Sequence, residues 1–154
     1  MKASPEIGIR RIYNTAFAER GRSDVIKWEA IPVGDGEVLT LHFESVASPW
    51  RQGVWLRTDR GITINGQTAP SMVLWQDTAS AVVLFTCHCT NGFLSFYNVW
   101  YSAKTATEME SPSYSSGMLA EELPDGLRYR CNDIGFDTQF QKLVFSIRRT
   151  TKCA

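Results

Sequence analysis

Alternation of apolar and polar residues constrains this chain more than any other feature. The segment 38–43 places Leu39, Leu41 and Phe43 on one side of an extended chain, and the segment 142–147 repeats the pattern. Successive side chains of a β-strand point to opposite faces, so a period of two predicts strands with one buried face and one wet face. The chain is therefore expected to be built from half-buried strands.

Short turn signals separate these runs. They are Gly34-Asp35-Gly36, Thr58-Asp59-Arg60-Gly61, Asn65-Gly66, Thr90-Asn91-Gly92 and Pro124-Asp125-Gly126. Glycine and asparagine tolerate the positive φ angles that tight turns need. About nine or ten short strands at this spacing predict an all-β fold, which we expect to be an antiparallel two-sheet β-sandwich of jelly-roll type.

Helix is expected at one place at most. Asn14 can cap a turn or two over residues 14–20, and Gly21 can end it. The segment 102–116 is rich in Ser, Thr and Glu and contains Pro112, which predicts a long surface loop. No internal repeat or linker divides the chain, and 154 residues is an ordinary domain size, so one domain over residues 1–154 is expected.

The net charge and the hydropathy of the chain limit the classes of partner and the cellular location that we expect. Lys and Arg together number 16 and Asp and Glu number 16, so nothing in the net charge favours nucleic acid or an anionic membrane. The longest apolar stretch, 79–87, is too short to span a bilayer. The first residues lack the apolar centre of a secretory signal, which predicts a cytoplasmic protein, with secretion left open.

Cys87-His88-Cys89 is the sequence's most obvious candidate for a metal site, because zinc prefers Cys and His ligands. On a strand, however, both cysteines share a face with Val83 and Phe85, which marks that face as core. We therefore predict buried, reduced thiols without a metal. Four glutamates, Glu108, Glu110, Glu121 and Glu122, are expected to be solvated rather than paired for catalysis.

The C-terminal segment 133–145 contains Asp133 and Asp137, followed by Phe140 and Leu143-Val144-Phe145. It resembles the end of secreted bacterial β-sandwich domains, in which an acid-rich, calcium-binding loop enters the last strand. The whole chain also resembles, in general pattern, carbohydrate-binding modules and galactose-binding domains. Gln139, Gln141 and Lys142 stand where that pattern has acids, so no calcium site or other cofactor is expected.

Aromatic residues suggest where a ligand would bind, since the chain has five Trp and five Tyr. Val54 and Leu56 are expected to face the core, which sends Trp55 and Arg57 to the opposite face. An exposed Trp beside a charged donor is a frequent recognition pair. We predict that these two residues contact a ligand first. Weaker candidates are Trp50, Asp59 and Trp100. Trp28 is expected in the core, and Trp100 half-buried at a strand end.

Three functions fit this pattern. The leading prediction is a non-catalytic binding module for a carbohydrate or another small polar ligand. The second is a sugar-active hydrolase or lyase with His42 or a glutamate as its base, which a cleft lined by such a residue would favour. The third is a structural protein that forms a homo-oligomer through a sheet face, which a flat apolar face would favour.

Overall fold

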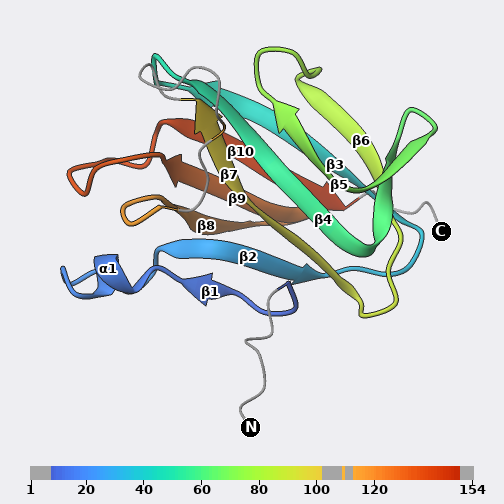
Figure 1. Cartoon of the computed structure of the whole chain (residues 1–154), viewed down its shortest axis with the longest axis horizontal. Coiled ribbons are helices and arrows are strands. Elements are labelled where there is room, and N and C mark those ends of the chain that lie inside the picture. The colour runs from blue at the N-terminus through green and yellow to red at the C-terminus, as the bar shows by residue number, and fades with distance from the viewer. Residues whose placement is uncertain (1–7, 102–108, 110–112, 150–154) are drawn as a thin grey trace, which may run out of the picture.

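The computed structural model describes residues 8–101, 109 and 113–149, and in them the chain forms one antiparallel sheet and a four-residue helix. Figure 1 shows the strands wrapped around a common interior. The elements are β1 (Ile12–Tyr13), α1 (Thr15–Ala18), β2 (Ile26–Pro32), β3 (Glu37–Val46), β4 (Arg51–Ile64), β5 (Gln67–Trp75), β6 (Val82–Cys87), β7 (Phe93–Tyr101), β8 (Gly117–Leu123), β9 (Gly126–Asn132) and β10 (Leu143–Arg149).

The prediction of a two-sheet, jelly-roll β-sandwich is wrong. The strands follow the order β2-β7-β4-β6-β3-β10-β9-β8, and β8 then pairs with β2, which closes the sheet into an eight-stranded barrel. The closing pair is Ile26 with Met118. Gly117 permits this approach, because a Cβ atom there would lie 2.3 Å from Cγ1 of Val25. Period-two alternation is common to sandwiches and barrels, so it could not distinguish them.

A bend in β4 makes the closure possible. Residues Arg51 to Arg57 pair with β7, whereas Ile62 and Thr63 pair with β6, and β5 follows β4 on its other edge. Between the two halves, the hydroxyl of Thr58 donates to the carbonyl of Gly61 (2.7 Å) and accepts from its amide (2.8 Å). The sequence 58–61 was expected to be a turn between strands. It is instead a bulge inside one long strand, with Gly61 at a φ of +107°.

The core fills the inside of the barrel with large side chains. Phe96 packs edge-on against Tyr129, with ring centroids 5.0 Å apart, and Tyr129 stacks on Phe145 at 5.3 Å. The predicted helix is confirmed as α1, where the amide of Ala16 donates to Asn14 Oδ1. Phe17 of α1 packs on Phe140 in a second, smaller cluster.

Two further expectations concern the loop 102–116 and membrane-spanning segments. Most of the predicted loop 102–116 lies outside the described residues, and its described end at Ser115 and Ser116 is buried. Within the part of the chain that the structure describes, no helix has the length and apolar character needed to cross a membrane.

Candidate functional site

The outer face of β4 is the first component of the candidate site. Val54 and Leu56 are fully buried inside the barrel, and Arg57 is exposed. The predicted register of this strand is therefore confirmed: Trp55 and Arg57 point outward. Figure 1 shows β4 and β7 running side by side across the near face, as their pairing requires.

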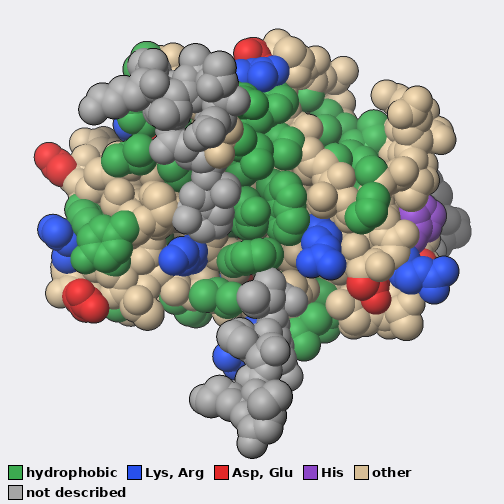
Figure 2. Space-filling view, viewed as in Figure 1, with side chains coloured by type: hydrophobic (Ala, Val, Ile, Leu, Met, Phe, Trp, Pro, Cys, Tyr) green, Lys and Arg blue, Asp and Glu red, His purple; other side chains and the backbone are tan. Residues whose placement is uncertain are grey.

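An aromatic cluster covers the middle of this face. Trp55 stacks on Tyr97 of β7, with centroids 4.5 Å apart and planes inclined by 17°. Trp28 of β2 meets both rings edge-on, at 5.6 Å from Trp55 and 5.0 Å from Tyr97. Trp28 was expected in the core, but it is half-buried on the outside. Figure 2 shows hydrophobic side chains gathered across this face.

A second aromatic group extends the same face along β4. Trp75 of β5 stacks on Tyr101 at 4.9 Å, and the guanidinium of Arg51 lies 4.5 Å from the Trp75 ring centroid. Gly53 provides the space, because a Cβ atom there would lie 2.7 Å from Cε3 of Trp75. Arg51 also pairs with Asp77 at 2.8 Å, so its charge is engaged.

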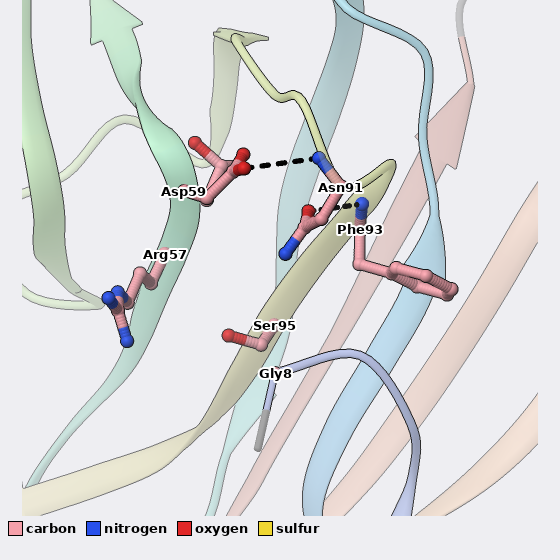
Figure 3. Close-up of a pocket in the computed structure, with 7 residues that line it drawn as sticks. Gly8, Arg57, Asp59, Asn91, Phe93 and Ser95 are labelled. Carbon is pink, nitrogen blue, oxygen red and sulfur yellow. Dashed lines mark hydrogen bonds between the residues drawn. The ribbon is translucent and has the colours of Figure 1, made fainter. Parts of the chain in front are cut away.

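A small polar pocket lies beside the bend of β4 (Figure 3). Its volume is about 80 Å³, which is ample for several atoms since one water needs about 10–15 Å³. β4, β7 and the turn between β6 and β7 supply most of the lining. The lining residues are Gly8, Arg57, Thr58, Asp59, Asn91, Phe93 and Ser95.

Hydrogen bonds shape this pocket. Asp59 accepts from two backbone amides, that of Thr90 at 2.9 Å and that of Asn91 at 3.1 Å. Asn91 Oδ1 in turn accepts from the amide of Phe93 at 3.1 Å. The carboxylate of Asp59 thereby ties the turn between β6 and β7 to the bend of β4.

The five predicted contact residues do not all meet. Arg57 and Asp59 line the pocket, and Trp55 lies next to Arg57 on the same face of β4. Trp50 is half-buried just before the start of β4, away from the pocket lining. Trp100 was expected to be half-buried and is completely buried, because its strand position opposite Gln52 points it away from solvent. It cannot contact a surface ligand in this conformation.

Five of the lining residues were not among the predicted contacts, namely Gly8, Thr58, Asn91, Phe93 and Ser95. Asn91, Phe93 and Ser95 come from a turn and a strand whose register against β4 is a long-range property. The β4–β7 register places Ser95 opposite Arg57, and nothing local in the sequence indicates this. The asparagine within Thr90-Asn91-Gly92 was recognised only as a turn residue.

Glu29 is a buried carboxylate that follows Trp28 on β2, and it faces inward where Trp28 was expected to do so. Arg11 donates to it twice, at 2.9 and 2.8 Å, and the hydroxyl of Tyr129 donates at 2.8 Å. The hydrogen bonds that Arg11 donates to Glu29 raise the pKa of Arg11, and burial raises the pKa of Tyr129. A local irregularity in the pairing of β1 with β2 reverses the expected orientation of Trp28 and Glu29. Because its carboxylate is fully hydrogen-bonded within the chain, we assign Glu29 a structural role.

Asp133 is saturated in the same way. Its Oδ2 accepts from Ser48 and Gln52, and its Oδ1 accepts from the amide of Ile134 and from Nζ of Lys142 at 3.3 Å. A lysine ammonium thus occupies the position beside this carboxylate that a cation would take, and Asp137 is exposed. The expectation that this loop binds no calcium stays a prediction.

The cysteines on the described residues are free and buried, as expected for Cys87 and Cys89. Burial raises the pKa of Cys87 to about 12, so its thiolate, the nucleophilic form, is scarce at neutral pH. His88 points elsewhere and lies 2.8 Å from the hydroxyl of Thr63. Among the described residues, no group of three or more His, Cys, Asp or Glu side chains is placed to hold a metal ion.

The remaining candidates for catalysis lie away from the pocket. His42 is on β3, with Nε2 3.2 Å from the hydroxyl of Thr40. Glu121 and Glu122 are exposed on β8, and Glu121 pairs with Arg128 and Arg130. Glu108 and Glu110 lie outside the described residues.

Comparison of the chain with models of known protein families finds no match, and comparison with curated proteins finds no match either.

Proposed function

We propose that this chain is a non-catalytic binding protein for a small polar ligand, with a carbohydrate as the leading class. The proposed binding surface is the outer face of β7 and β4, with Trp55 at its centre and the Arg57 pocket at its edge. The resemblance to sandwich-type carbohydrate-binding modules no longer supports this proposal, because the fold is a barrel. The support comes from the side chains alone.

The observation that carries the proposal is the guanidinium of Arg57. It lines the pocket and has no hydrogen-bond or ion-pair partner among the described residues, in contrast to Arg51 six residues earlier on the same strand. Five N–H donors beside a formed polar pocket are available to a ligand. The adjacent ring edges of Trp55 and Tyr97 offer the apolar contact that complements such donors.

The geometry favours binding over catalysis at this place. Among the described residues, the pocket is lined by one carboxylate, Asp59, and by no histidine or glutamate. Both oxygens of Asp59 already accept backbone hydrogen bonds, which suits a structural or recognition role. His42, the base named for the enzymatic alternative, does not line it.

Self-association is a second candidate, favoured by the apolar character of the same outer face. A homo-oligomer would bury Trp55 and Trp75 against a second copy. Sedimentation velocity over a range of protein concentrations measures this directly. A monomer at all concentrations would remove the candidate.

We propose a cytoplasmic location, which the free thiols of Cys87, Cys89 and Cys131 support because reduced cysteines are usual in a reducing compartment. Measuring its distribution between cytoplasmic and secreted fractions tests that assignment.

A thermal-shift screen with mono- and oligosaccharides tests the binding proposal. A ligand at about one hundred times its Kd adds about 2.7 kcal/mol to the free energy of unfolding, so a true ligand raises Tm measurably. The matched pair is Arg57→Ala, expected to abolish the shift, and Arg130→Ala on β9, expected to retain it. A screen in which no sugar raises Tm would contradict the carbohydrate proposal.

A further inference from the structure

The hydrogen-bonding groups left uncommitted in the pocket are almost all donors. Asn91 spends its Oδ1 on the amide of Phe93, which fixes the orientation of the side-chain amide and leaves Nδ2 as a donor. Ser95 is 3% exposed, and its hydroxyl has no partner among the described residues. Figure 3 shows the Ser95 hydroxyl directed toward the strand that carries Arg57.

The oxygen acceptors of the pocket, by contrast, already form hydrogen bonds with backbone groups. Thr58 uses its hydroxyl on both backbone groups of Gly61, and Asp59 holds two backbone amides. Arg57, Asn91 and Ser95 therefore converge on the pocket with hydrogen atoms to donate and few oxygens to receive any. The guanidinium of Arg57 and Nδ2 of Asn91 have no partner among the described residues, so both can donate to a ligand that supplies acceptors.

We propose that the ligand of this pocket is an acidic carbohydrate, whose carboxylate is bound by Arg57, Asn91 Nδ2 and the hydroxyl of Ser95. This inference rests on the proposed carbohydrate function and adds the charge of the ligand. A guanidinium matches a carboxylate in geometry and binds it through charge-assisted hydrogen bonds.

Asp59 explains why a sugar acid fits better than a free oxyanion. Each of its oxygens accepts one backbone hydrogen bond and keeps a further lone pair, to which a sugar hydroxyl can donate. A bare sulfate has no hydroxyl to donate to Asp59, so it would meet this negative charge in the same 80 Å³ space without a compensating hydrogen bond. A molecule that carries both hydroxyls and a carboxylate satisfies Asp59 and Arg57 together.

The test compares acidic glycans with neutral counterparts of the same stereochemistry. Oligogalacturonate is matched with its methyl ester, and an array carries other uronate-containing and sialylated glycans beside their neutral forms. We expect acidic glycans to bind at least tenfold more tightly than the neutral partner, since hydrogen bonds to a charged group are the stronger ones. The advantage should vanish in Arg57→Ala, shrink in Asn91→Ala and Ser95→Ala, and persist in Arg130→Ala.

The outcomes separate the inference from the function beneath it. Equal binding of acidic and neutral glycans, or acidic binding that survives Arg57→Ala, overturns the inference and leaves carbohydrate binding standing. Inorganic phosphate or sulfate that raises Tm when no glycan does would assign the pocket to a free oxyanion and overturn it as well. An array without any bound glycan removes both the inference and the carbohydrate proposal. Since Arg57 is exposed, its variant should fold, which an unchanged circular dichroism spectrum verifies.

Discussion

The carboxylate of Glu29 and the guanidinium of Arg57 lie on β2 and β4, on either side of β7, and they are treated in opposite ways. Glu29 is completely buried and receives hydrogen bonds from Arg11, Tyr129 and the amide of Ala30. Arg57 is exposed beside a pocket, and its guanidinium donates no hydrogen bond to the described residues. A charge that is fully satisfied within the chain holds the fold together, whereas a charge left without partners next to a formed pocket is available to a second molecule.

The sharpest way to break this comparison is to remove Glu29. Glu29→Ala leaves the buried hydroxyl of Tyr129 without its acceptor and the half-buried guanidinium of Arg11 without its ion-pair partner. Breaking a buried pair in this way costs about 3–5 kcal/mol. Equilibrium urea unfolding measures the loss, with exposed Glu122→Ala as the control, expected within about 0.5 kcal/mol of wild type. A loss from Glu29→Ala as small as the control would show that the network is not structural.

The thiol of Cys87 gives the next largest effect, as a dependence on pH. Burial raises its pKa from 9.0 to about 12, so the folded state holds the proton more tightly than the unfolded state. Its contribution to stability is complete below pH 9 and is lost as the pH rises toward 12. Between pH 9 and pH 12, the free energy of unfolding measured by urea titration should therefore decrease more steeply with pH for wild type than for Cys87→Ala. The same pH dependence in both proteins would contradict a raised pKa for the Cys87 thiol.

Trp55 should have an intermediate effect. Trp55→Ala removes the stack on Tyr97 and the edge contact with Trp28, but the side chain is only half-buried. A loss of about 1–3 kcal/mol is expected, below the 3–5 kcal/mol typical of a fully buried aromatic. Trp55→Phe keeps one ring and should recover part of the loss. A loss equal to that of Trp100→Ala would place Trp55 energetically in the core.

Arg57 should have the smallest effect on stability. With no partner among the described residues to lose, Arg57→Ala should change the free energy of unfolding by less than about 0.5 kcal/mol. Thermal unfolding without ligand measures it. A loss above 1 kcal/mol would mean that Arg57 stabilises the fold, and the contrast with Glu29 would disappear.

Local features of the fold could be predicted from the sequence, and long-range ones could not. Alternation predicted the strands and the outward orientation of Trp55 and Arg57, and Asn14 predicted the start of α1. The barrel depends on pairing Ile26 with Met118, residues far apart in sequence, and on a bulge whose composition is that of a turn. No periodicity carries that information.

The candidate site was predictable to the same extent. Arg57 and Asp59 lie two positions apart on β4, so the alternation of that one strand was enough to predict that they lie together. Asn91 and Ser95 reach them only through the pairing of β7 with β4, and Glu29 is turned inward by an irregularity at the β1–β2 pairing. Trp100 was misplaced because the strand end was expected to be open, whereas it lies inside.

The bridge between Ile26 and Met118 makes the barrel a ring with a narrow seam. β3 and β10, by comparison, are joined along seven paired positions, so separating them requires many hydrogen bonds to break at once. Thermal breathing of the ring should therefore begin at the seam, and the amide hydrogens of β8 next to β2 should exchange with solvent long before those of β10. The molecule is in this sense a cylinder that opens along one line, and β2, on one side of that line, pairs with β7, a strand that lines the pocket.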